Sequence, residues 1–195
     1  MSVIFGIVEN NSIIIAGDRR ASSIDGTFIS DNEQKVTEIN GHLGIVTAGN
    51  VAIEKAVLKN VDDREDKAHM VIDDLVKSIR EFYDKVIENQ CDSIFNLPFY
   101  CLIAGEGSDG KGHLINAGRF KNGFAAKEVP MALYPPNDLD QDTCNQIFVR
   151  NYKLFHGQFC ERTVQEVAGL SKIVGPTGNK WIYSCASKKG KMYLF

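Results

Sequence analysis

Residues 2–22, SVIFGIVENNSIIIAGDRRAS, decide the fold of this chain. Two runs rich in β-branched residues, 2–8 and 12–17, flank the turn signal Glu9–Asn11 and predict a β-hairpin. The second run is very apolar and is followed directly by Asp18. The pattern therefore predicts a buried strand that carries a carboxylate at its end.

The rest of the chain is organised in blocks of strands and helices. The further predicted strands are 35–39, 43–47, 99–105, 113–117, 180–186 and 191–195. The predicted helices are 50–59, 68–88, 138–155 and 162–173. Residues 19–33 are expected to be irregular, and the prolines between 130 and 136 are expected to interrupt the chain. This order predicts an α+β fold, a four-layer αββα sandwich formed by a single domain, 1–195.

Composition narrows the class of protein. The 195 residues are 44% hydrophobic and 24% charged, an ordinary globular balance. A net charge of −3 argues against a nucleic-acid partner, and no apolar run approaches the roughly 20 residues that span a bilayer. With no secretory signal and five cysteines that lack C-x-x-C spacing, we expect a cytoplasmic protein with reduced thiols. The four histidines share no metal-ligand spacing, so neither a metal nor a cofactor is expected.

The amino-terminal residues contain the parts that an N-terminal nucleophile needs. Removal of Met1 would leave Ser2 with a hydroxyl that attacks and an α-amine, of pKa about 7.7–8.0, that serves as its base. Lys35 would lower the pKa values of both groups, and Asp18 could pair with it. Gly49 follows a strand and precedes a helix, a suitable place for a backbone amide that holds an oxyanion.

In this order, the residues resemble the catalytic half of a proteasome β-type subunit, an N-terminal-nucleophile (Ntn) hydrolase. The resemblance implies the Ntn-hydrolase fold, a peptide or amide substrate and a homo-oligomeric ring. It implies catalytic roles for Ser2, Asp18, Lys35 and Gly49. It also implies substrate-binding roles for residues around the cleft, namely Arg20, Ala21, Ser22, Ala48 and Val51.

The carboxy-terminal half departs from the family's pattern. Residues 131–136 lack the expected Gly-Ser-Gly motif. Where the family has Asp-x-x-Ser-Gly-Gly, this chain has Ser171 in place of the acid and Val174 in place of the serine. Near the predicted cleft, the small and apolar residues, among them Val51 and Ile53, predict a moderately small, apolar pocket.

Three functions are compatible with these residues. The first is amide-bond hydrolysis, by a peptidase or amidase that uses Ser2. The second is a non-catalytic structural subunit of a proteasome-like ring, which the substitutions at Ser171 and Val174 favour. The third is amide transfer to an amine acceptor, which the same acyl-enzyme permits when water is excluded.

Overall fold

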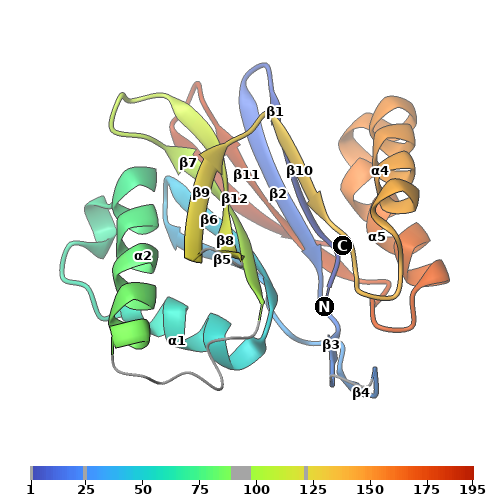
Figure 1. The fold of residues 1–195 in the computed structure, drawn as a ribbon. Coiled ribbons are helices and arrows are strands. Elements are labelled where there is room, and N and C mark those ends of the chain that lie inside the picture. Colours follow the sequence, from blue (N-terminus) through green and yellow to red (C-terminus); the bar gives the residue numbers. More distant parts are fainter. Residues whose placement is uncertain (1, 24–25, 89–97, 121–122) are drawn as a thin grey trace.

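A computed structural model of the chain describes residues 2–23, 26–88, 98–120 and 123–195. Two five-stranded antiparallel sheets form its centre (Figure 1). The first sheet, in spatial order, consists of β10 (Met131–Tyr134), β1 (Ile4–Glu9), β2 (Ser12–Asp18), β11 (Gly178–Ser184) and β12 (Lys189–Leu194). The second consists of β5 (Val36–Asn40), β6 (Leu43–Gly49), β7 (Phe99–Glu106), β8 (Gly112–Phe120) and β9 (Gly123–Glu128). A small separate hairpin is formed by β3 (Ala21–Ser22) and β4 (Phe28–Ser30).

Helices cover the outer face of each sheet (Figure 1). The α-helices are α1 (Val51–Asp62), α2 (Ile72–Glu88), α4 (Gln141–Phe155) and α5 (Phe159–Leu170). Single 3-10 turns are formed by η1 (Lys67–His69) and η2 (His156–Gln158). Helices α1 and α2 pack on the second sheet, and α4 and α5 pack on the first. Among the described helices, none is long and apolar enough to cross a membrane.

The inner faces of the two sheets pack against each other. Alternation along β1 explains this arrangement, because Ile4 faces the other sheet while Phe5 faces helices α4 and α5. Isoleucines of β2 do the same, since Ile15 lies in the core between the sheets and Ile14 lies under the helices. Burial on both faces is why the β2 sequence is almost continuously apolar.

Trp181 of β11 fills the space between the sheets. The tryptophan is fully buried, and its indole nitrogen donates a hydrogen bond to Glu38 Oε2 at 3.1 Å. Two glycines make room for the ring, because a Cβ on Gly44 would lie 2.6 Å from it and a Cβ on Gly190 only 1.8 Å. One residue therefore contacts both sheets at positions where no other side chain fits.

Most predicted elements are confirmed, and the differences have physical causes. The stretch 19–33 was expected to be irregular, but it contains strands β3 and β4. Residues 131–134, between Pro130 and Pro135, form the edge strand β10, whose pairing with β1 is a tertiary contact without a local signal. Strand β9 precedes Pro130 and was not predicted. Helix α2 begins at Ile72 rather than residue 68, because residues 67–69 form a 3-10 turn.

Four cysteines lie in the described part of the chain, and each is a free thiol. Cys101, Cys144 and Cys160 are buried, and Cys185 is partly exposed. Burial raises the pKa of the Cys160 thiol to about 12, so this side chain behaves as a small apolar group. The fifth, Cys91, lies outside the described residues.

Candidate active site

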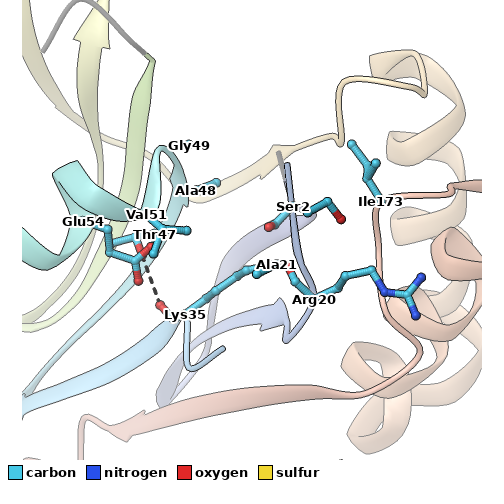
Figure 2. A pocket seen from close by; sticks show the side chains of 11 residues that line it. Ser2, Arg20, Ala21, Lys35, Thr47, Ala48, Gly49, Val51, Glu54 and Ile173 are labelled. Carbon is cyan, nitrogen blue, oxygen red and sulfur yellow. Dashed lines mark hydrogen bonds between the residues drawn. The ribbon is translucent and has the colours of Figure 1, made fainter. Parts of the chain in front are cut away.

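A pocket at one end of the two sheets brings the amino-terminal residues together with parts of both sheets (Figure 2). Eleven residues line it: Ser2, Arg20, Ala21, Ser22, Lys35, Thr47, Ala48, Gly49, Val51, Glu54 and Ile173. Of the nine residues predicted from the sequence, only Asp18 is absent from this lining. Asp18 is fully buried and contacts the pocket through Lys35.

Asp18 joins four separate segments of the chain. Its Oδ2 lies 3.1 Å from Lys35 Nζ, and the two side chains are 0% and 4% exposed. The same oxygen accepts from the backbone nitrogens of Arg20 at 2.9 Å and Gly175 at 3.3 Å. Oδ1 accepts from the backbone nitrogen of Val3 at 3.1 Å. This full set of donors compensates for burial of the carboxylate and fixes Lys35 relative to the chain's first residues.

Lys35 is held at both ends. Its ammonium donates to the carbonyl oxygen of Arg20 as well as to Asp18. Its own carbonyl oxygen accepts from the Thr47 backbone nitrogen at 3.1 Å and from Thr47 Oγ1 at 3.5 Å. Figure 2 shows the hydroxyl contact as a dashed line beside Glu54. The lysine is therefore a fixed positive charge on one wall of the pocket.

The Arg20 side chain has a structural role at the rim. Its guanidinium donates to both carboxylate oxygens of Asp31, at 2.7 and 3.0 Å, and lies 5.3 Å from the centre of the Phe28 ring. Hydrogen bonding from Arg20 holds the pKa of Asp31 below its usual value. These contacts fasten the β3–β4 hairpin beside the pocket, and the backbone carbonyl of Arg20 is the part that contacts Lys35.

Gly49 occupies a position that only glycine fits. Its φ is +128°, and a Cβ there would lie 2.2 Å from the carbonyl oxygen of Pro98. Helix α1 begins immediately afterwards, and Asn50 caps it by accepting from the backbone nitrogens of Ala52 and Ile53 at 2.9 and 3.3 Å. The sequence thus turns sharply from strand to helix and leaves one wall of the pocket without a side chain.

Small side chains complete the predicted substrate wall. Ala21 and Ala48 are buried, and Val51 and Ser22 are partly buried. The Ser22 hydroxyl oxygen is buried and has no hydrogen-bond partner among the described residues. Because buried polar atoms are normally paired, this hydroxyl is a free hydrogen-bonding group at the edge of the pocket.

Three lining residues were not predicted from the sequence, namely Thr47, Glu54 and Ile173. The expectation of an apolar pocket is wrong, because Ile53 points into the core under α1 while Glu54 lines the pocket. Glu54 is only 5% exposed, and desolvation raises the pKa of its carboxyl to about 7. The available signal was its spacing, since Glu54 follows Val51 by three residues and so lies on the same helix face.

The loop after α5, where the family's motif is expected, is held by a carboxylate from another segment of the chain. Ser171, in the acid position of that motif, donates its hydroxyl to Asp138 Oδ1 at 2.8 Å. Asp138 Oδ2 accepts from the backbone nitrogen of Lys172 at 2.8 Å. A carboxylate from the segment before α4 thus organises the loop that places Ile173 in the pocket.

The fold and the site together define the class of protein. The arrangement is an α+β fold of the Ntn type, with Ser2 7% exposed in a pocket beside a buried lysine. A family model described as Proteasome subunit matches residues 2–117, more than half of the chain. The chain belongs to the proteasome subunit family. No curated protein matches it in a sequence comparison.

Proposed function

We propose that this protein hydrolyses amide bonds with Ser2 as its nucleophile after removal of Met1, which lies outside the described residues. The observation that supports this proposal most directly is the composition of one pocket. Ser2, Lys35 and Gly49 all line it, and Asp18, which is buried outside the lining, is ion-paired to Lys35. A nucleophile, a fixed cation and a side-chain-free backbone turn are the groups that acyl transfer requires.

In the proposed reaction, Ser2 Oγ attacks the carbonyl carbon of the scissile amide while its α-amine takes the hydroxyl proton. The Lys35 ammonium lowers the pKa values of both groups, and Asp18 keeps that ammonium in place. The Gly49 N–H stabilises the oxyanion of the tetrahedral intermediate. The α-amine then gives its proton to the leaving amine, and water releases the acyl group from Ser2.

The substrate proposed for this site is a peptide or a related amide. Ala21, Ser22, Ala48 and Val51 would contact its backbone and side chain, with the Ser22 hydroxyl offering an unused hydrogen bond. The Arg20 guanidinium is bound to Asp31, so this side chain would contribute to substrate binding indirectly, by holding the β3–β4 hairpin beside the pocket.

The proposal extends to the assembly and its setting. We interpret the two covered sheets as the four-layer αββα sandwich of a single domain. Membership of the proteasome subunit family supports a homo-oligomeric ring. The four free thiols support a cytoplasmic setting.

A structural, non-catalytic subunit is the second candidate. It is favoured by the altered loop after α5, where Val174 is fully buried and Ser171 is bonded to Asp138. Such a subunit would assemble with the pocket unused. The two candidates differ in whether the α-amine of Ser2 is freed and reactive.

The test is covalent labelling of Ser2 by a β-lactone, read by intact mass, in protein whose mass shows that methionine has been removed. We expect one acyl adduct in the wild type, none in Ser2→Ala, and an adduct in Ser2→Thr, which keeps the hydroxyl. Ser12→Ala is the matched control, because it removes a hydroxyl in the β1–β2 hairpin outside the pocket. Labelling that survives Ser2→Ala would refute the mechanism.

A further inference from the structure

Glu54 is a buried carboxyl that the proposed reaction does not use. It lies in the first turn of α1, is 5% exposed, and lines the same pocket as Ser2 and Lys35. Among the described residues, no ion pair includes it. An unpaired carboxyl in such a place costs folding free energy, so its presence beside a reactive centre points to a function.

The Thr47 side chain lies between Glu54 and the backbone of Lys35. Hydrogen bonding with the Thr47 side chain lowers the pKa of the Glu54 carboxyl, and Thr47 Oγ1 lies 3.5 Å from the Lys35 carbonyl oxygen (Figure 2). A threonine hydroxyl has one hydrogen. While Glu54 is protonated, its carboxyl can donate to Thr47 Oγ1, and the Thr47 hydroxyl can then donate to the carbonyl oxygen of Lys35. Once Glu54 is ionised, it competes with the Lys35 carbonyl for the same hydrogen.

The charged groups around the carboxyl act in both directions. Burial is the largest influence and raises the pKa of Glu54, and the nearby Glu33 raises it further. The Thr47 hydroxyl, Lys35 and Lys55 lower it. By reciprocity, a negative charge on Glu54 stabilises protonated amines nearby. It also disfavours a second negative charge, such as the oxyanion beside Gly49.

We propose that Glu54 acts on the pocket through its charge, and that the pocket is reactive while the Glu54 carboxyl is protonated and loses reactivity once it ionises. This inference rests on the proposed function of Ser2. Ionisation of Glu54 would raise the pKa of the Ser2 α-amine, so that less free base is present at a given pH, and would oppose oxyanion formation. The site would therefore switch off with rising pH, although a free α-amine alone would make it more reactive.

The experiment is the pH dependence of β-lactone acylation of Ser2, from pH 5 to 10, in methionine-free protein. For the wild type we expect a bell-shaped profile, with a falling limb that begins near pH 7. Glu54→Gln, which fixes the neutral state, should keep the rising limb and lose the fall, with a rate at least tenfold above that of wild type at pH 9. Thr47→Val should move the fall to higher pH, because the Thr47 hydroxyl lowers the pKa of Glu54.

Glu33→Gln is the matched control, because it removes the same charge from a partly exposed residue whose carboxylate pairs with Lys55 at 3.5 Å. It should keep the falling limb. Identical profiles for wild type and Glu54→Gln would overturn this inference alone. Absence of acylation in every variant at every pH would overturn the proposed function and this inference with it.

Discussion

The Ser171 hydroxyl donates a 2.8 Å hydrogen bond to Asp138, a residue 33 positions earlier in the chain. Asp138 also accepts from the backbone nitrogen of Lys172, so a single carboxylate caps the turn after α5. Ile173, two residues after Ser171, lines the pocket, and the backbone nitrogen of Gly175 donates to Asp18. The acid that organises this loop thus comes from another segment and not from the loop itself.

Removal of this carboxylate should loosen the loop. We expect Asp138→Ala to lower the free energy of unfolding by about 1–2 kcal/mol, since hydrogen bonds to a charged group are lost and Ser171 is left buried. Urea unfolding of Asp138→Ala, Ser171→Ala and the double variant would measure the coupling. Strictly additive effects would show that the two side chains do not interact in solution.

Breaking the buried ion pair should cost far more than breaking a surface pair. Lys35→Met leaves the Asp18 carboxylate buried without its counter-ion, and we expect a loss of about 3–5 kcal/mol in the free energy of unfolding. Asp62→Asn, which breaks the exposed pair with Lys67, should leave it nearly unchanged. Equal losses in chemical denaturation would mean that the buried pair is solvated.

Gly49 should tolerate no side chain. Gly49→Ala combines a backbone conformation unsuited to alanine with a close approach to the Pro98 carbonyl, so we expect a loss of about 3 kcal/mol or more. Gly169→Ala in α5 is the control, because nothing lies within 4 Å of its Cβ position, and it should stabilise the protein by up to about 1 kcal/mol. Thermal unfolding of both variants is the measurement, and an unchanged Tm for Gly49→Ala would contradict the prediction.

His113 should make stability depend on pH. Its ring nitrogens lie 2.8 Å from Asp109 Oδ1 and 2.7 Å from Glu128 Oε1, and hydrogen bonding to Asp109, followed by Glu128, raises the pKa of the histidine. A raised pKa in the folded state stabilises the protein below the unfolded value of about 6.5, and this contribution is lost as pH rises through the folded value. The stability gap between wild type and His113→Asn should therefore be larger at pH 5.5 than at pH 9. An NMR titration of the ring would show the shift directly.

Glu54 gives a second pH dependence that is independent of any reaction. The pKa of its carboxyl rises from 4.5 to about 7 on folding, so the folded state holds its proton more tightly than the unfolded state does. Wild type should lose stability relative to Glu54→Gln as pH rises from about 4.5 to about 7. Urea unfolding at several pH values would measure this loss, and a constant difference across that range would argue against the shift.

The sequence predicted the order of elements because strong local signals mark them. The Ile13–Ile15 run, the Asn40-Gly41 turn and the Asn50 cap are all read from neighbouring residues, and each lies where expected. Strands β9 and β10 were missed because they are short, weakly patterned and dependent on partners. Edge pairing of this kind is a property of the assembled sheet.

The site was predicted in part for a similar reason. Ser2, Lys35 and Gly49 belong to one ordered motif near the amino terminus, so their spacing carried the prediction. The contribution of Asp138 could not be read in this way, because this residue lies 33 positions before the Ser171 to which it is hydrogen-bonded. Glu54 was missed because a glutamate on a helix is ordinarily exposed, and only packing shows this one to be buried.

The position of Trp181 between the sheets gives this protein a built-in optical reporter. It is the only tryptophan in the chain, and its ring is enclosed by Gly44 on one sheet and Gly190 on the other. Its fluorescence will therefore change when the sheets separate and will not change when the helices outside them fray. Comparing its emission with helical circular dichroism during unfolding would show whether the outer helices melt before the central sheets part.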